Sequence, residues 1–297
     1  MQDTAPIAII GLGLIGTALS ERLIDAGMPV IGFDVDPARC RSFEAAGGKI
    51  AASVHELAGQ SRILVVAVYS GMQAEAVLHE IAGGAGSPRP TVICMTTCAP
   101  DEMARLSEYA ANAGIALIEA PVSGTSAEVR DGSAVALLAA EPALIESVGT
   151  LLDILCPHRL RVGTVGDASR TKLAINLILQ ANRAALAEGI AFAEALGLDG
   201  RTFLATARAS AAYSRVMETK GEKMLARDFR PQSHIAQTLK DAELILEEAG
   251  RRGLPLPLTA AQAGLLREAI VIEGPHSDSA AVITAIRPRA AVSGALR

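Results

Sequence analysis

A glycine-rich turn near the start of the chain constrains the fold more than any other feature. The apolar run PIAII leads into GLGLIG at residues 11–16, and a second apolar run, VIGFD, ends on Asp34. A strand, a glycine turn, a helix and a second strand ending in an acid form the fingerprint of dinucleotide-binding units. Its glycines make the turn, let the backbone approach a pyrophosphate and let the helix pack on the strand. The residues expected to line this site are Gly11, Leu12, Gly13, Leu14, Ile15, Gly16 and Asp34.

The acid at the end of the second strand bears on the choice of cofactor. The carboxylate of Asp34 can accept hydrogen bonds from ribose hydroxyls and would repel a 2′-phosphate. Arg39 and Arg41 follow within one or two helical turns and are able to hold that phosphate. We therefore expect NAD, with NADP less favoured. Asp36, which precedes Pro37, is expected to cap the next helix rather than to bind a ligand.

Composition excludes several other classes of protein. The 297 residues carry a formal charge of −5 and include no tryptophan. The sequence also lacks a basic patch interleaved with aromatic rings, so nucleic acid is not an expected partner. The four cysteines and five histidines lack metal-site spacing, and we expect no metal and no disulfide framework. The apolar runs are too short to span a membrane, and MQDTAP leaves no room for a signal peptide. We therefore expect a cytoplasmic protein with no membrane partner.

Two patterns divide the chain near residue 165. Before it, short β-rich runs alternate with helical stretches, which is typical of a doubly wound sheet. After it, alanine- and leucine-rich helices dominate. The expected fold is α/β: a doubly wound Rossmann-type parallel sheet in residues 1–165, followed by an all-α domain in residues 166–297, joined by a long helix. Strands are expected at 7–10, 30–34, 62–68, 91–95, 115–120, 134–140 and 159–163, with Glu141-Pro142 starting a helix between the last two.

The long helix is expected over 168–196, closed by Gly197, and it is apolar around most of its circumference. Such a helix is buried between domains or subunits, so we expect a homodimer or homotetramer built through the helical domain. Further helices are expected at 201–208, 213–225, 233–252, 258–273 and 277–286, and the last residues, RAAVSGALR, are expected to fray.

Polar segments follow three of the expected strands. They are residues 69–71 (YSG), 96–100 (TTCAP) and 121–125 (PVSGT). Ligands bind beyond the carboxyl ends of the strands in such a sheet, so these hydroxyls could line a nicotinamide ribose and a small substrate. For Ser70 or Thr96 alone, helix capping is an equal alternative. The segment 121–125 places two hydroxyls and flexible amides together, which suits an anionic carboxylate.

The start of the long helix carries a second polar group. Lys172 and Asn176 are four residues apart and share a face, and Gln180 lies one turn further on. A lysine on an apolar helix either extends its ammonium to water or occupies a cleft, where desolvation lowers its pKa and suits it to proton transfer.

In this order, the motifs GLGLIG, TTCAP, EAPVSG, GDASRTKLAIN, FRPQSHIAQTLKDAEL and HSDSAAVI resemble the β-hydroxyacid dehydrogenase family, which includes 3-hydroxyisobutyrate dehydrogenases and tartronate semialdehyde reductases. The resemblance spans nearly the whole chain. It implies that Lys172 is the catalytic acid/base, that Asn176 holds the substrate and this lysine, and that Ser123 binds the substrate carboxylate. The further residues it implies are Gly124 and Thr125 for the substrate, Tyr69, Ser70, Thr97 and Lys240 for the cofactor, and Asp241 as a support for Lys240.

The chain departs from the family pattern at four positions. Thr125 replaces the second glycine of a serine-glycine-glycine segment, and Ile175 stands where many relatives carry asparagine. Ser233 and Gln237 replace apolar residues ahead of Lys240, so we expect a more polar pocket wall from the helical domain. These changes leave the expected hydride chemistry in place and assign no named substrate.

The resulting hypothesis is reversible hydride transfer between NAD and a small carboxylate-bearing 3-hydroxy acid, giving the semialdehyde or 3-oxo acid. The main alternative is a non-catalytic NAD-binding scaffold. A 6-phosphogluconate dehydrogenase-like enzyme is disfavoured because such enzymes are longer and carry histidine at the position of Ile175. An imine reductase-like enzyme is disfavoured because those enzymes lack the lysine.

Overall fold

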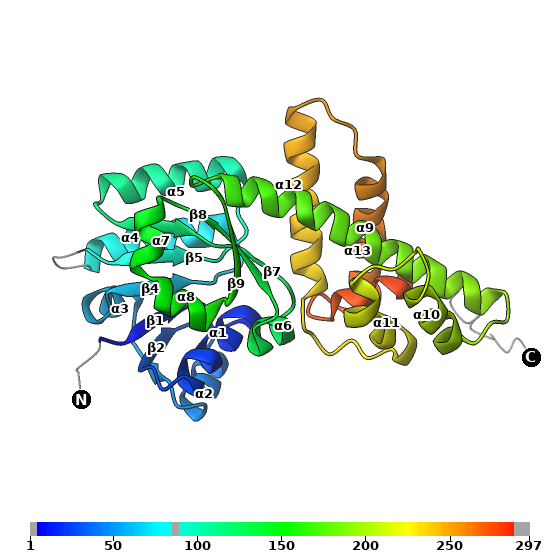
Figure 1. Cartoon of the computed structure of the whole chain (residues 1–297), viewed down its shortest axis with the longest axis horizontal. Coiled ribbons are helices and arrows are strands. Elements are labelled where there is room, and N and C mark those ends of the chain that lie inside the picture. Colours follow the sequence, from blue (N-terminus) through cyan, green and yellow to red (C-terminus); the bar gives the residue numbers. More distant parts are fainter. Residues whose placement is uncertain (1–4, 85–88, 288–297) are drawn as a thin grey trace, which may run out of the picture. The chain divides into compact units, whose positions relative to one another are not determined.

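The computed structural model describes residues 5–84 and 89–287, so the expected fraying of RAAVSGALR lies outside the described residues. The chain divides into two compact units, of which the first ends at Ile175 and the second begins at Asn176. The division falls inside the long helix α9 (Asp167–Ala195), which matches the helix expected over 168–196 (Figure 1).

The first unit is built on a mixed β-sheet whose strands run in the order β3-β2-β1-β4-β5-β6-β8-β7, with β9 paired to β8. The strands are β1 (Ile7–Ile10), β2 (Val30–Phe33), β3 (Lys49–Ile50), β4 (Ile63–Val66), β5 (Thr91–Cys94), β6 (Ala116–Glu119), β7 (Val122–Ser123), β8 (Val135–Ala139) and β9 (His158–Gly163). The helices are α1 (Leu14–Asp25), α2 (Pro37–Ala45), α3 (Val54–Gln60), α4 (Gly71–Gly84), α5 (Pro100–Asn112), α6 (Ser126–Asp131), α7 (Pro142–Ser147) and α8 (Gly149–Leu155).

Alternation along the strands explains why this sheet is covered on both faces. In β1, Ile7 and Ile9 enter one apolar cluster with α1 and α8, whereas Ala8 and Ile10 enter another with α3, α4 and α5. Successive strand residues point to opposite faces, so near-continuous apolar strands require helices on both sides. This arrangement confirms the expected doubly wound fold class.

The far end of the sheet differs from the expected all-parallel arrangement. Strand β8 runs antiparallel to β6 and β7, and β9 is parallel to β8. A parallel connection requires a long crossover, but β7 and β8 are joined only by the short helix α6, which ends at Gly132 with a φ of 82°. The chain therefore folds back on itself at this point. Similarly, the single helix expected after Glu141 is divided at Val148 into α7 and α8.

The second unit is helical. Besides the second part of α9 it contains α10 (Gly200–Arg208), α11 (Val216–Ala226), α12 (Ile235–Arg251), α13 (Pro257–Glu273) and η1 (Ser279–Ala285). The α-helix expected over 277–286 was wrong in type, because η1 is a 3₁₀-helix. Its residues from Ser279 to Thr284 are all buried, so tertiary contacts rather than an amphipathic pattern determine its geometry. In the part of the chain described here, no helix has both the length and the apolar character to cross a membrane.

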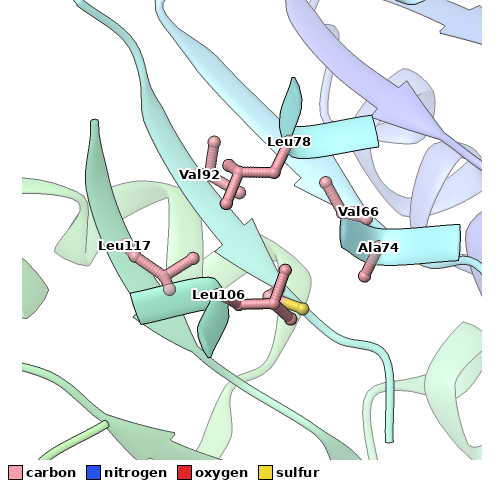
Figure 2. A pocket seen from close by; sticks show the side chains of 7 residues that line it. Val66, Ala74, Leu78, Val92, Leu106 and Leu117 are labelled. Atoms are coloured by element: carbon pink, nitrogen blue, oxygen red, sulfur yellow. The ribbon is translucent and has the colours of Figure 1, made fainter. Parts of the chain in front are cut away.

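A cavity of about 10 Å³ lies in the core of the first unit, between β4, β5, β6, α4 and α5 (Figure 2). It is lined by Val66, Ala74, Leu78, Val92, Cys94, Leu106 and Leu117. A space of this size holds about one water molecule, and an apolar lining offers that water no partner. The cavity is therefore a packing feature of the core, and a substrate site has to be sought at the strand ends and on the helices.

Candidate active site

The glycine turn after β1 has the geometry that close approach of a ligand requires. A Cβ atom at Gly11, where φ is 90°, would lie 2.6 Å from the carbonyl oxygen of Ala67, and one at Gly16 would lie 1.8 Å from the oxygen of Gly11. A Cβ at Gly13 would meet only Arg39 Nη1, at 3.8 Å. Gly11 and Gly16 are thus required by packing, whereas Gly13 leaves an open backbone surface.

The start of α1 fits a pyrophosphate at this open surface. Gly13 is the N-cap residue of α1 and supplies no side chain to cap it. The first N–H groups of a helix lack partners inside the helix, and they carry the positive end of its dipole. A phosphate is the group that such an uncapped turn binds best, so these residues fit a dinucleotide.

Asp34 connects the second strand to this turn. Its Oδ2 accepts a hydrogen bond of 2.7 Å from the Leu12 N–H, and its Oδ1 accepts one of 2.8 Å from the Asp36 N–H. Oδ1 has a second lone pair, so Asp34 can still accept a ribose hydroxyl. Arg39 Nη1 lies 3.4 Å from the same Oδ2, and 47% of the Arg39 side chain is exposed. As predicted, Asp36 caps α2, because it accepts a hydrogen bond from the Ala38 N–H.

The parallel register aligns the ends of β1, β4 and β5, since Ile10 pairs with Val66 and Val66 pairs with Cys94. The segments 69–71 and 96–100 therefore follow strands that end beside the glycine turn. Thr97 is half-buried here, and the Tyr69 side chain is 47% exposed.

Two hydroxyls at these strand ends have structural roles. Thr96 Oγ1 donates to the Val68 carbonyl and accepts from the Val68 N–H, both at 3.2 Å, which ties the two strand ends together. Ser70 Oγ accepts a 3.3 Å hydrogen bond from the Gln73 N–H at the start of α4. The capping alternative therefore accounts for Ser70 but not for Thr96, which bonds to the backbone of a strand end, and the assignment of Ser70 to the cofactor stays a prediction.

The segment 121–125 contains β7 and the start of α6. Ser123 and Gly124 are partly buried, and a Cβ at Gly124 would lie 2.7 Å from Ala134 Cβ. Thr125 is the N-cap of α6, where its Oγ1 accepts from the Glu128 N–H at 3.3 Å and donates to Glu128 Oε2 at 3.1 Å. Because the Thr125 hydroxyl is occupied by this cap, Ser123 and the Gly124 backbone are the better candidates for binding a carboxylate.

Glu119 is a residue of this site that the sequence analysis missed. It lies at the end of β6, is fully buried, and accepts 2.6 Å hydrogen bonds from the N–H groups of Gly166 and Ser169 and another from the Ser169 hydroxyl. Burial raises the pKa of Glu119 even though these hydrogen bonds oppose the shift. Glu119 thereby fixes the first turn of α9, which carries Lys172. A lone acid at the end of an apolar strand was the available signal.

Lys172 and Asn176 are both buried on α9, with exposed fractions of 5% and 4%. Asn176 Nδ2 donates a 2.9 Å hydrogen bond to Asp241 Oδ2, and Lys240 Nζ lies 3.1 Å from Asp241 Oδ1. The expected support of Lys240 by Asp241 is present, and the same carboxylate also orients Asn176. This second contact was not expected.

The buried face of α9 continues beyond Asn176 with polar residues. Gln180 donates from Nε2 to the Thr238 carbonyl at 3.1 Å and accepts at Oε1 from Gln262 at 2.8 Å. Arg183 follows, 6% exposed. We call the buried residues Ser169, Lys172, Asn176, Gln180 and Arg183 the polar stripe of α9. Beyond it the buried face becomes apolar, starting with Leu186.

A buried ion pair joins α11 to η1. Lys220 Nζ contacts both oxygens of Asp278, at 2.8 and 2.9 Å, and lies 3.1 Å from Ser233 Oγ. Burial lowers the pKa of Lys220 to about 8, and the Asp278 carboxylate opposes this shift. Asp278 also accepts from the N–H groups of Gln232, Ser233 and Ala280, so the ionised pair is the state that these donors favour near neutral pH.

Among the described residues, no group of three or more His, Cys, Asp or Glu side chains could hold a metal ion.

Two family models match the chain, one for each unit. Residues 6–163 match the NAD-binding domain of 6-phosphogluconate dehydrogenase, and residues 166–286 match the NAD-binding domain of NADP-dependent 3-hydroxyisobutyrate dehydrogenase. These matches and the open glycine turn define an oxidoreductase that binds NAD or NADP.

Individual relatives agree with these models. L-threonate dehydrogenase of Cupriavidus necator is 30% identical, over 93% of this chain and 94% of that protein. The 2-(hydroxymethyl)glutarate dehydrogenase of Eubacterium barkeri is 27% identical, over 88% of this chain and 87% of that protein. The crystal structure of 3-hydroxyisobutyrate dehydrogenase (ygbJ) from Salmonella typhimurium has the same fold, with a TM-score of 0.84 and 24% identity over 94% of this chain and 98% of that one. The chain belongs to the β-hydroxyacid dehydrogenase family.

Proposed function

We propose that the protein is an NAD-dependent dehydrogenase that transfers hydride reversibly between the nicotinamide and a small 3-hydroxy acid, giving the semialdehyde or 3-oxo acid. The observation that supports this proposal most is the burial of Lys172, on a helix whose first turn is fixed by Glu119. A lysine withdrawn from bulk water exchanges its proton with a bound substrate rather than with solvent, which suits a general acid/base.

Lys172 Nζ would take the hydroxyl proton of the substrate during oxidation and return it during reduction. The nicotinamide, when bound, accepts the hydride with its two electrons in oxidation and donates it in reduction. Ser123 and the Gly124 backbone would bind the substrate carboxylate. Asn176, oriented by Asp241, would hold the substrate near Lys172, one helical turn away. These contacts contribute mainly by orientation.

For the cofactor, we propose NAD over NADP. Asp34 keeps a lone pair on Oδ1 available for a ribose hydroxyl, and its charge would repel a 2′-phosphate. Arg39 supports the alternative, since its guanidinium lies beside Asp34 and is half exposed. The sites proposed for Gly11–Gly16, Tyr69, Thr97 and Lys240 are compatible with either dinucleotide.

We also propose a homodimer or homotetramer assembled through the helical unit. Large apolar side chains in this unit are exposed, with exposed fractions of 66% for Phe192, 76% for Leu258 and 84% for Val271. Exposed apolar groups in this number are commonly covered by another subunit. Light scattering on the purified protein measures the mass, and a monomer would contradict this proposal.

A panel of substrates tests the proposed function. Purified protein is mixed with NAD and with NADP in parallel and offered L-threonate, 3-hydroxyisobutyrate, 2-(hydroxymethyl)glutarate and, as a control without a 3-hydroxyl, lactate. We expect formation of reduced cofactor with NAD and at least one 3-hydroxy acid, and none with lactate. Tight NADH binding without turnover of any compound would instead identify a non-catalytic scaffold.

A further inference from the structure

The polar stripe of α9 ends in a buried cation, Arg183, two of whose nitrogens lack hydrogen-bond partners among the described residues. Arg183 is 6% exposed, and among the described residues neither its Nε nor its Nη1 has a hydrogen-bond partner. Burial lowers the pKa of Arg183 to about 10, and the carboxylates of Asp278 and Asp241 oppose this shift. The guanidinium therefore stays charged at neutral pH, and a buried charge without hydrogen bonds is costly unless a partner arrives.

The two carboxylates near Arg183 also contact other groups, although Asp241 Oδ1 is itself a buried acceptor without a hydrogen-bond partner among the described residues. Asp278 binds Lys220 and three backbone N–H groups, and Asp241 binds Asn176 and lies beside Lys240. The charged groups of this cluster are Arg183 on α9, Lys220 on α11, Lys240 and Asp241 on α12, and Asp278, the N-cap residue of η1. Arg183 is the cation of this cluster whose buried Nε and Nη1 have no hydrogen-bond partner among the described residues.

We propose that Arg183 binds a second carboxylate of the substrate, so that the preferred substrate is a 3-hydroxy acid with an additional acidic side chain. This proposal rests on the proposed function and names its substrate class. The seven residues from Asn176 to Arg183 span about 10 Å of helix, and helical side chains lean toward the N-terminus. That spacing leaves room for a side chain of about two or three carbons between the reacting carbon and the second carboxylate.

The surroundings of Arg183 support a polar rather than an apolar substrate end. Ser233 lies beside Lys220, and Gln180 bonds to Thr238 and Gln262 one turn before Arg183. The alternative is that Arg183 only balances the charge of Asp241 and Asp278. The two interpretations predict different stabilities for a variant that lacks Arg183. If Arg183 binds the substrate, this variant should stay folded, because Asp278 keeps Lys220 and three N–H donors. If Arg183 is a structural counter-ion, the variant should be destabilised.

The first experiment compares three substrates that differ only at the side chain of the carbon next to the hydroxymethyl group. They are 3-hydroxyisobutyrate, with a methyl group, 2-(hydroxymethyl)pentanoate, with a propyl group, and 2-(hydroxymethyl)glutarate, with a carboxyethyl group. The measured quantity is the ratio of kcat/KM for the glutarate to kcat/KM for the pentanoate, in which any general loss of activity cancels. We expect this ratio to exceed about 10 in the wild type, as one charge-assisted pair implies, and to fall to about 1 in Arg183→Met.

Two variants control this experiment. Arg183→Lys keeps the charge and should recover part of the ratio. Arg208→Met removes another arginine of the helical unit, one that donates to the Met217 carbonyl and pairs with Glu218, and it should leave the ratio unchanged. An unchanged ratio in Arg183→Met, or an Arg183→Met protein that fails to fold, would show that Arg183 is a structural counter-ion and overturn the proposal.

A binding measurement separates this inference from the proposed function. Glutarate has no hydroxyl to oxidise, and butyrate has only one carboxylate. We expect glutarate to raise the Tm of the wild type and not of Arg183→Met, and butyrate to shift neither. If the wild type oxidises 3-hydroxyisobutyrate but glutarate binds equally to both proteins, the inference alone fails. If no substrate is oxidised, the proposed function fails together with the substrate class, and the glutarate result decides whether the anion site exists.

Discussion

Backbone N–H groups are the main partners of the buried acids in the first unit, whereas buried side chains are a larger share of the partners in the second unit. Asp34 and Glu119 accept mainly backbone N–H groups, from the turn after β1 and from the first turn of α9. In the helical unit, Asp241 meets the side chains of Asn176 and Lys240, and Asp278 binds Lys220 in addition to three backbone N–H groups. There, one cation of the cluster keeps unused donors.

This difference separates two tasks. Backbone N–H donors remain when a side chain is substituted. The first unit can therefore bind one cofactor through a turn whose geometry three glycines define. Side-chain pairs change with each substitution, so the helical unit can adjust to the distal end of a substrate. We therefore expect the glycine turn and the start of α9 to carry the chemistry common to the family. We expect Gln180 and Arg183, at the end of the polar stripe, to determine the choice of substrate.

The largest expected effect concerns the ion pair of the helical unit. Asp278→Ala leaves Lys220 as a buried charge and removes the acceptor of three backbone N–H groups, so we expect a loss of about 3–5 kcal/mol in the free energy of unfolding. Asp153→Ala is the matched control, because the Asp153 side chain is 67% exposed in its pair with Arg159, and it should cost less than about 1 kcal/mol. Urea unfolding measures both. Equal losses of unfolding free energy in the two variants would show that the buried Lys220–Asp278 pair contributes no more than an exposed ion pair.

A smaller loss is expected when the backbone-binding acid of the first unit is removed. Glu119→Ala leaves the Gly166 and Ser169 N–H groups without their acceptor, which should cost about 2–3 kcal/mol. Because this turn positions Lys172, kcat should also fall, by about 10-fold. Glu141→Ala is the control, since Glu141 is an exposed N-cap residue that makes no side-chain cap hydrogen bond. Full retention of kcat in Glu119→Ala would contradict the positioning role.

Removing the charge of Asp34 should change the preference for NAD over NADP by the free energy of about one charge-assisted hydrogen bond. Asp34→Asn removes the charge that favours ribose hydroxyls over a 2′-phosphate, so we expect the ratio of kcat/KM with NAD to that with NADP to fall by about 10-fold. Asp36→Asn removes a neighbouring charge that caps α2 and lies 3.6 Å from Arg39 Nε, and it should change the ratio much less. If both variants shift the ratio equally, the effect comes from net charge and not from the Asp34 site.

The smallest effects concern pH, and the two units should respond in opposite directions. Burial alone would raise the pKa of Asp278, but Lys220 and the N–H donors outweigh it and lower that pKa, so its contribution to stability is lost only as pH falls below the usual value of about 3.9. Burial raises the pKa of Glu119, so the folded state binds the extra proton, and stability decreases as pH rises from about 4.3 through that raised pKa. Urea midpoints between about pH 2 and pH 7 should show that the slope below about pH 3.9 disappears in Asp278→Asn and that the slope above about pH 4.3 disappears in Glu119→Gln.

Much of the first unit could be predicted from the sequence because its signals are local. The glycine turn, the acid at Asp34 and the long apolar strands each occupy a few consecutive residues. The two-residue strands β3 and β7 were missed because they are too short for a periodic pattern. The antiparallel pairing of β8 was missed because strand direction depends on how the chain returns after β7.

The polar stripe of α9 shows what the sequence could not provide. Lys172, Asn176 and Gln180 could be grouped by helical spacing, and Arg183 continues the same spacing. Spacing alone does not show which face is buried. The role suggested for Arg183 depends on burial and on Asp278, which lies 95 residues further along the chain. The hydrogen bonds of Glu119 likewise join residues about 50 positions apart.

Turnover by Lys172→Ala tests the central claim most directly. With saturating cofactor and the best substrate of the panel, we expect kcat to fall by about 10²–10⁴-fold, the usual contribution of a general acid/base, while the dissociation constant for NADH and the Tm stay close to those of the wild type. Retention of most of the turnover in a folded, NADH-binding Lys172→Ala protein would contradict the assignment of Lys172 as the proton-transferring group.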